Sequence, residues 1–224
     1  NQQGAKQLRM GMAWCYRSDV ESWPSSLEPG ALVEIVDSQK NCIGQAFSAS
    51  KSPVAVRLLT RKSAKDETVD EAFFMARIER SLERRSSLAA RDAYRLIHGE
   101  ADLIPGLFVD RYGTALCVQT LSEGADARKL LFAQLLSKLK RVDTIVSRDD
   151  GSGRDFEGLG RSKSVLLDGG HSRIRYHEGS IRFDIDLLTD SKTGSFLDQV
   201  DNHLRSGQLA KGEALDTFSY HGGF

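Results

Sequence analysis

The ten residues 215–224 place an acidic side chain directly before a glycine turn. Leu215-Asp216-Thr217-Phe218-Ser219-Tyr220 predicts a buried strand, and Gly222-Gly223 predicts a tight turn after it. In α/β proteins such a strand delivers a carboxylate, and glycines let the backbone come close to a ligand. The two glycines are adjacent and lack the G-x-G-x-x-G spacing, which disfavours a nicotinamide or flavin site. A nucleotide-type cofactor loop and an ordinary strand with a glycine turn are the two interpretations.

The segment 191–202, Ser-Lys-Thr-Gly-Ser-Phe-Leu-Asp-Gln-Val-Asp-Asn, is a second candidate site. A Lys-Thr-Gly turn that leads into a helix presents an ammonium group and backbone donors to an anion. It lacks the full G-x-x-x-x-G-K-[ST] pattern, so phosphate hydrolysis is not indicated. The alternative is a plain helix N-terminus with a solvated lysine.

A third segment, 98–113, contains a histidine, carboxylates and an arginine among glycines and a proline. These types can perform acid–base chemistry. The glycines and Pro105 more directly predict a loop and a hairpin, in which His98 and the Asp110-Arg111 pair fix the loop by hydrogen bonds.

Basic residues without acidic neighbours occupy 51–65, and arginines recur on one face of the helix expected after residue 70. Such residues can contact a phosphate backbone. The alternative is solvated surface charge, because Glu79, Glu83 and Asp92 dilute the helix. The residues that could face a nucleic-acid backbone are Lys51, Arg57, Arg61, Lys62, Arg77, Arg80 and Arg84.

Composition narrows the remaining classes. Lysine plus arginine and aspartate plus glutamate number 31 each, so net charge does not indicate a nucleic-acid partner. Cys15, Cys42 and Cys117 form no CxxC pair, which argues against a zinc site or a disulfide framework. They stand in strand-like contexts typical of small apolar residues. We expect no membrane partner and a cytoplasmic location, because the sequence shows neither an apolar span nor a signal peptide.

Period-two and period-four patterns predict the elements that position these segments. Three short strands over 31–36, 42–47 and 54–59 suggest a small barrel or sandwich. A helix begins at Asp70 and carries Phe74, Ile78 and Leu82 on one stripe.

The pattern after residue 93 predicts an α+β unit. Its expected elements are a meander of three strands over 94–119, a helix over 127–139, a strand over 144–147, an exposed loop over 149–163, two strands around Glu178-Gly179, a helix over 196–206 ended by Gly207, and the strand that begins at Leu215.

Three segments carry a family resemblance in one order: R-L-I-H-G-E-A-D-L-I-P-G-L-F-V-D-R-Y-G, K-T-G-S-F-L-D-Q-V-D-N and L-D-T-F-S-Y-H-G-G-F. With Trp14 to Val20, Pro29-Gly30 and Lys51 to Thr60, the chain resembles bacterial S-adenosylmethionine-dependent methyltransferases of the 23S rRNA 5-methylcytosine type.

The resemblance implies a multidomain α+β and β protein. Its parts are a PUA-like RNA-binding β-barrel (1–67), a connecting helix (68–92), a central α+β domain with mixed strands around one helix (93–189), and the beginning of a Rossmann-like α/β methyltransferase domain (190–224). The implied cofactor is S-adenosylmethionine and the implied partner is ribosomal RNA, while a homodimer is left open.

The resemblance also implies cofactor contacts. These are Lys192, Thr193, Phe196 and Gln199 in the segment that closes over the cofactor, and Asp216, Phe218, Ser219, Tyr220, Gly222 and Gly223 in the first cofactor motif. Four positions depart from the family pattern: Ser195 replaces Phe, Val200 replaces Arg, His221 replaces Thr, and Cys15 replaces a more common apolar residue.

Methylation at pyrimidine C5 needs a cysteine that adds to C6 and a base that removes the C5 proton. In the family these residues follow the first glycine motif, so we expect the catalytic residues beyond Phe224 and assign none in this chain. We therefore expect the 224-residue chain to be inactive alone. The alternative function is a non-catalytic RNA-binding module. The sequence does not indicate the target nucleotide.

Overall fold

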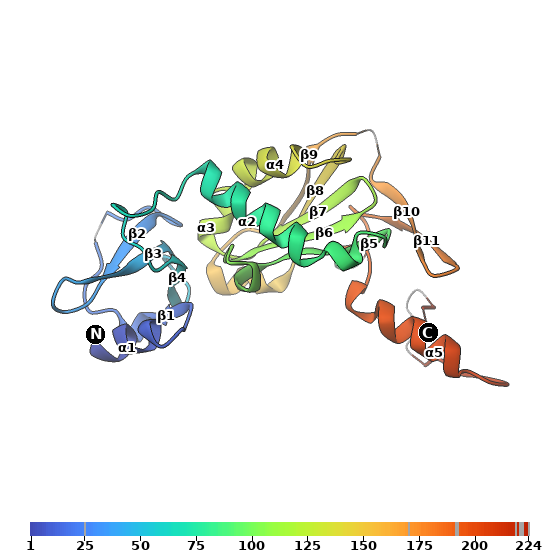
Figure 1. Cartoon of the computed structure of the whole chain (residues 1–224), viewed down its shortest axis with the longest axis horizontal. Helices are drawn as coiled ribbons and strands as arrows, with labels where there is room; N and C mark the ends of the chain where they lie inside the picture. The colour runs from blue at the N-terminus through green and yellow to red at the C-terminus, as the bar shows by residue number, and fades with distance from the viewer. Residues whose placement is uncertain (25, 170, 191–192, 218, 220–221, 224) are drawn as a thin grey trace.

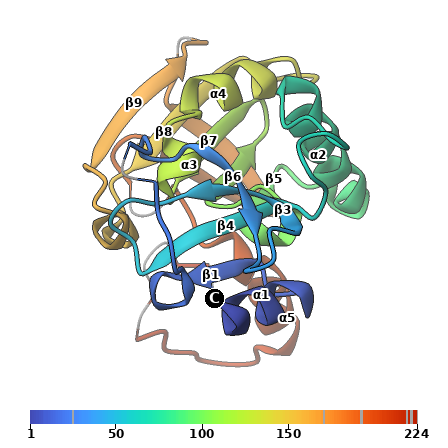
Figure 2. The ribbon, with the colours of Figure 1, turned by 90° about the vertical axis from the view of Figure 1, so that its left-hand side faces the viewer.

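The computed structural model describes residues 1–224 apart from residues 25, 170, 191–192, 218, 220–221 and 224. The molecule is elongated, and Figure 1 shows the N-terminal strands at one end and the last helix at the other. A large mixed sheet lies between them, and Figure 2 views the molecule from the N-terminal end. No helix among the described residues is long and apolar enough to cross a membrane.

The N-terminal part is a four-stranded antiparallel sheet in the order β1-β4-β3-β2. Helix α1 (Gln2–Arg9), capped by the Asn1 side chain, packs Ala5 and Leu8 against it. The three predicted strands are confirmed, and β1 is an addition that the sequence analysis did not predict. The strands are β1 (Trp14–Tyr16), β2 (Leu32–Val36), β3 (Cys42–Ser48) and β4 (Val54–Thr60), with a 3-10 turn, η1 (Arg17–Asp19), after β1.

Helix α2 (Glu71–Arg84) begins where the sequence predicts, because the Asp70 side chain accepts a hydrogen bond from the Phe73 N–H. Phe74 and Ile78 are buried and join the main core. The helix ends at Arg84 and is followed by η2 (Ser86–Leu88).

The central sheet has the order β5-β6-β7-β8-β9. The predicted meander is confirmed, and β7 and β8 are the parallel pair. The parallel pairing requires a crossover, which helices α3 and α4 provide. The elements are β5 (Ala93–His98), η3 (Gly99–Asp102), β6 (Leu107–Tyr112), β7 (Ala115–Thr120), α3 (Glu123–Asp126), α4 (Lys129–Ser137), β8 (Thr144–Asp149) and β9 (Ser162–Leu167).

The segment predicted as an exposed loop over 149–163 is exposed at most of its positions, but it is not irregular throughout. A 3-10 segment, η4 (Ser152–Glu157), and the start of β9 occupy it, and Asp149, Arg154 and Glu157 are buried. The buried charges are paired inside the fold: Arg154 Nη1 lies 3.3 Å from Asp149 and 3.0 Å from Asp126.

Strands β10 (Arg173–Glu178) and β11 (Ile181–Asp186) form the predicted hairpin as a separate two-stranded sheet. Next come η5 (Leu197–Gln199) and α5 (Val200–Leu209). The prediction that Gly207 ends this helix is wrong, because α5 continues through it to Leu209. A glycine inside a helix costs only about 1 kcal/mol and does not by itself stop one.

The strand predicted from Leu215 is not formed over its described part. Residues 213–216 have no regular secondary structure, and Leu215 is 87% exposed. A strand is stabilised by pairing with a neighbour, and the described sheets do not include these residues. The predicted cofactor positions Phe218 and Tyr220 lie outside the described residues. So does Phe224, the residue beyond which the catalytic groups are expected, and that expectation stays a prediction.

Candidate functional site

Thr193 and Ser195, in the described part of the Lys-Thr-Gly segment, dock on the central sheet. Thr193 is buried, and its Oγ1 donates to Asp110 Oδ2 at 2.5 Å. Asp110 lies on β6 and is 1% exposed. Its carboxylate also accepts a hydrogen bond from Arg95 Nη2 at 3.1 Å. The Thr193 hydroxyl is therefore committed to Asp110, and Lys192 lies outside the described residues.

A pair of tyrosines continues this contact. The backbone N–H of Ser195 donates to the Tyr112 hydroxyl at 3.1 Å, and the Tyr176 hydroxyl lies 2.7 Å from Ser195 Oγ. Burial raises the pKa of both tyrosines, so they stay neutral hydrogen-bonding groups. Ser195, which replaces the Phe expected from the resemblance, thus contacts both tyrosines.

The segment 98–113 thus has two roles. Its hairpin geometry is as predicted, because Arg111 Nε bonds the Gly113 carbonyl at 2.9 Å and the His98 N–H bonds Asp102 at 2.7 Å. Asp110 and Tyr112 do more than hold the hairpin, since they receive the Lys-Thr-Gly segment from 83 residues away.

The last helix joins the same region through His203. His203 Nδ1 lies 2.7 Å from Glu178 Oε2, and Glu178 also lies 3.2 Å from the Tyr176 hydroxyl. Gly223 is buried, and a Cβ added there would stand 2.6 Å from His203 Cε1. The glycine turn therefore rests on α5. The sequence analysis missed Tyr176, Glu178 and His203, because nothing in their local pattern sets them apart.

The other predicted cofactor contacts are more open. Phe196 and Gln199 belong to the turn at η5, and Gln199 Oε1 accepts from Asn202 at 2.9 Å. Asp216 and Ser219 are exposed, and the Gly222 N–H donates to the Ser219 carbonyl at 2.5 Å. Gly222 has a φ of +69°, and the space that a Cβ would fill is open.

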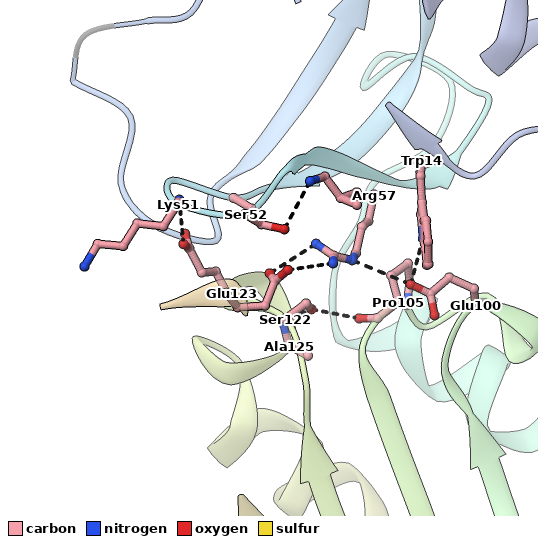
Figure 3. Close-up of polar contacts among 12 residues, drawn as sticks. Trp14, Lys51, Ser52, Arg57, Glu100, Pro105, Ser122, Glu123 and Ala125 are labelled. Atoms are coloured by element: carbon pink, nitrogen blue, oxygen red, sulfur yellow. Dashed lines mark hydrogen bonds and ion pairs between the residues drawn. The ribbon is translucent and has the colours of Figure 1, made fainter. Parts of the chain in front are cut away.

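Arg57 was predicted to face RNA, and the structure gives it another place. Its guanidinium is buried and donates two hydrogen bonds to Glu157, at 3.1 and 2.7 Å. The Trp14 ring lies beside it, and Glu100 accepts from Trp14 Nε1 at 2.9 Å (Figure 3). Arg57 is therefore an interdomain residue, because a buried, bidentate ion pair commits the guanidinium to a carboxylate rather than to phosphate.

The remaining basic residues of the N-terminal sheet differ in whether protein groups already occupy their side chains. Lys51 is exposed, and its backbone N–H is bonded to Glu123 at 3.3 Å. Lys62 pairs with Glu67 at 3.1 Å on the surface. Arg61 bonds the carbonyls of Leu8 and Met12.

Three arginines of α2 line a groove of about 460 Å³ beside the linker after β4. Arg80 is exposed. Arg77 donates to the carbonyls of Leu59 (2.8 Å) and Leu103, and burial lowers its pKa to about 10. Arg84 bonds the Ala101 carbonyl at 2.7 Å. The structure thus brings Arg77, Arg80 and Arg84 together, as predicted.

The cysteines do not form a reactive cluster. Cys15 and Cys117 are buried and Cys42 is exposed at the start of β3. Burial is the largest effect on each thiol and raises all three pKa values. Among the described residues, no group of three His, Cys, Asp or Glu side chains is placed to hold a metal ion.

Comparison with known proteins defines the class first. Residues 1–61 match the family model of a PUA-like domain. A candidate SAM-dependent methyltransferase from Streptococcus mutans has the same fold, with a TM-score of 0.75 and 16% identity over 92% of this chain and 52% of that one. A candidate methyltransferase solved with SAH gives a TM-score of 0.73, at 16% identity over 90% and 50% of the two chains. The chain therefore contains a PUA-like domain and shares its fold with about half of each of these two proteins.

The particular relatives come from sequence. The chain is 32% identical over 224 residues to ribosomal RNA large subunit methyltransferase I of Erwinia tasmaniensis, and 31% identical over 225 residues to the proteins of that name from Aliivibrio fischeri and Tolumonas auensis. Each match covers 98% of this chain and 56% of the relative. The chain is similar to these ribosomal RNA methyltransferases and spans about half the length of those it matches, and this similarity confirms the resemblance in its motifs.

Proposed function

We propose that this chain supplies the RNA-binding and central domains of an S-adenosylmethionine-dependent methyltransferase that modifies C5 of a cytosine in ribosomal RNA. The support is the relation to ribosomal RNA large subunit methyltransferase I over 98% of the chain, together with the PUA-like match at residues 1–61. The cytosine and its C5 position rest on the motif resemblance.

One structural observation carries the proposal furthest. The Lys-Thr-Gly segment, which the resemblance places against the cofactor, is held by Thr193 on Asp110 and by Ser195 on Tyr112. Both acceptors are buried in the central sheet, so their positions are set by packing. A segment fixed in this way is preorganised to close over a ligand, which is how binding energy is kept for orientation rather than for ordering a loop.

The proposed cofactor contacts fit S-adenosylmethionine in kind. When bound, the cofactor supplies an electrophilic methyl group. Asp216 offers an exposed carboxylate, and Gly222 leaves its Cβ space open for a close approach. Thr193 positions its segment through its hydrogen bond to Asp110. The further proposed contacts are Phe196 and Gln199 at η5, and Ser219 and Gly223 in the glycine turn. Lys192, Phe218 and Tyr220 complete the proposed set.

RNA binding is proposed at the junction of the PUA-like sheet and α2. The groove beside α2 offers the exposed guanidinium of Arg80 and the partly committed ones of Arg77 and Arg84. Lys51 and Lys62 add exposed ammonium groups on the sheet. Contacts of this kind go to phosphates and make affinity depend on salt.

We expect the 224-residue chain to transfer no methyl group alone. Nucleophilic attack on C6 needs a thiolate, and burial raises the pKa of Cys15 and Cys117 and keeps them from solvent. Cys42 is exposed on β3, and its pKa is also raised. Methyl transfer to ribosomal RNA by the purified chain, followed with labelled cofactor, would contradict this expectation.

Calorimetric titration with S-adenosylhomocysteine tests the cofactor part. Binding that is weakened by Asp216→Ala, and unchanged by the control Glu213→Ala on the same exposed segment, would support the site. Absence of binding at millimolar concentration would leave the alternative function, an RNA-binding module without cofactor affinity.

A salt series with ribosomal RNA tests the RNA part. Arg80→Gln is expected to weaken binding and to lower the slope of log K against log salt by about 1, since one phosphate contact is lost. Arg161→Gln, at an exposed pair with Asp155, serves as the control of equal charge change. Equal slopes for both variants would remove the groove from the proposed RNA surface.

A further inference from the structure

The PUA-like sheet and the central domain share an interface made of buried charged groups. Glu123 is 4% exposed at the start of α3, and its carboxylate accepts from the Ser50 N–H (2.8 Å), the Ser50 hydroxyl (2.7 Å) and the Lys51 N–H (3.3 Å). All three donors stand in the turn between β3 and β4, and Figure 3 shows Lys51 of this turn beside Glu123. One carboxylate of the central domain therefore holds the backbone of a PUA-like turn.

A second set of contacts lies further along the same interface. Arg57 of β4 binds Glu157 of η4 with both terminal nitrogens, and its Nε lies 3.7 Å from Glu100 of η3. Glu157 is 3% exposed. Arg154 ties η4 in turn to the Thr120 carbonyl and to the Gly160 carbonyl at 2.8 Å, so Glu157 sits on an anchored element.

Packing closes the space between the two sets. The Arg128 guanidinium lies 4.4 Å from the centre of the Phe47 ring and donates to the Gly30 carbonyl at 2.8 Å. A Cβ at Gly124 would lie 2.2 Å from Phe47 Cγ, and one at Gly30 would lie 2.4 Å from the Glu123 carbonyl oxygen. Phe47 belongs to the same hydrophobic core as the central sheet.

Such an interface resists relative motion. Domains joined by polar, weakly packed contacts move against each other by default. Here the carboxylates of Glu123 and Glu157 are buried, and so is Arg57, the partner of Glu157, so a change of angle would leave buried charges unpaired. The charged groups fix the relative orientation of the two domains more strictly than apolar packing would, because a bidentate ion pair forms in only one geometry.

We propose that Glu123, Glu157 and Arg57 are positioning residues that hold the PUA-like sheet at a fixed angle to the α2 groove. The chain would then select RNA by the spacing between phosphates that reach the sheet and phosphates that reach the groove. The fixed angle stands on the contacts alone, whereas the selection of RNA rests on the proposed function. Arg77 marks the shared boundary, because it bonds Leu59 on one side and Leu103 on the other.

A distance measurement tests the fixed angle without RNA. Spin labels are placed on the exposed native Cys42 of β3 and on Gln134→Cys, an exposed position of α4, in the full 224-residue chain. A single narrow distance distribution is expected. It should persist in the control Arg161→Gln and broaden in Glu123→Gln with Arg57→Met, provided that circular dichroism shows both proteins folded. An unchanged distribution in the double variant would overturn the positioning role.

RNA binding is the second measurement and separates the two ideas. The probes are a transcribed large-subunit ribosomal RNA fragment and a short single-stranded oligonucleotide. Loosening the interface is expected to weaken fragment binding at least about tenfold, because two linked contacts lose their effective concentration, and to leave oligonucleotide binding nearly unchanged. Equal losses for both probes would overturn selection by spacing. Failure of the parent chain to bind either RNA would contradict the proposed function and leave the distance result intact.

Discussion

The structural role of several single residues in this chain depends on the partner that each one contacts. Thr193 and Asp110 illustrate this, since each is ordinary in its own segment and their hydrogen bond joins the two candidate motifs. Asp102 is a second case: it is buried and holds Arg85 through two bonds of 2.9 and 2.7 Å. Both carboxylates are structural anchors with measurable consequences.

Replacing Thr193 by valine keeps the shape and removes the hydroxyl. Asp110 keeps Arg95 but loses one donor inside the protein, so we expect a loss of about 1–2 kcal/mol in the free energy of unfolding. Urea denaturation measures it. Thr193→Ser retains the hydroxyl and should stay within about 0.5 kcal/mol of the parent. An equal loss in both variants would show that packing of the methyl group dominates.

Asp102 is expected to make the stability of the fold depend on pH in the acid range. Burial alone raises its pKa, but hydrogen bonds from Arg85 and from the His98 N–H outweigh burial, and its pKa is lowered. A carboxyl with a lowered folded pKa contributes stability that is present above about pH 4 and lost as pH falls through the folded value. The variant Asp102→Asn should therefore be less stable at neutral pH and lose less stability on acidification. Denaturation at several pH values measures this. Glu79→Gln, which removes an exposed carboxylate from α2, should retain the parent's pH dependence.

Elements in this fold meet at close distances that glycines permit. Helix α3 approaches β3 so nearly that Gly124 touches the Phe47 ring, and the same ring stacks with Phe74 of α2 at 6.1 Å. The elements of both domains thus meet on one aromatic side chain.

The variant Gly124→Ala tests this approach. An added Cβ would fall 2.2 Å from Phe47 Cγ, so ring and helix must move apart. We expect a loss of about 1–3 kcal/mol in unfolding free energy, the usual range for an overfilled core. Gly153→Ala is the control, because nothing lies within 4 Å of its added Cβ. Thermal and urea unfolding decide between them, and similar melting temperatures for the two variants would contradict the close approach.

The whole molecule depends on ion pairs that join its two domains. Arg57 belongs to the N-terminal sheet and Glu157 to the central domain, and both are almost fully buried. Removing one partner of such a pair is costlier than removing both, because the charge left behind has no water to solvate it.

Arg57→Ala is therefore expected to lower the unfolding free energy by about 3–5 kcal/mol. The double variant Arg57→Met with Glu157→Leu should recover much of the loss, since neither charge is then stranded. Equilibrium denaturation with one probe in each domain measures both effects. A double variant no more stable than Arg57→Ala would show that the pair is needed for more than charge balance.

Sequence patterns predicted those features that depend on neighbours along the chain. Asp70 capping α2, the stripe of Phe74 and Ile78, and the alternation in β11 follow from local spacing, and each is present. The strand expected at Leu215 failed, because apolar pattern alone does not form a strand without a partner. Most of the segment 149–163 is exposed as predicted, but Asp149, Arg154 and Glu157 are buried, because their charges find partners inside the fold.

The sequence by itself determined many of the helices and strands and the three motifs that carry the family resemblance, because periodicity and motif order are written locally. Only the tertiary structure decided which polar groups meet: Arg57 with Glu157 across 100 residues, and Thr193 with Asp110 across 83. The physical reason is that an arginine's sequence neighbourhood does not reveal whether it will face phosphate in water or a carboxylate in a buried interface. That choice depends on which surfaces the hydrophobic core brings together.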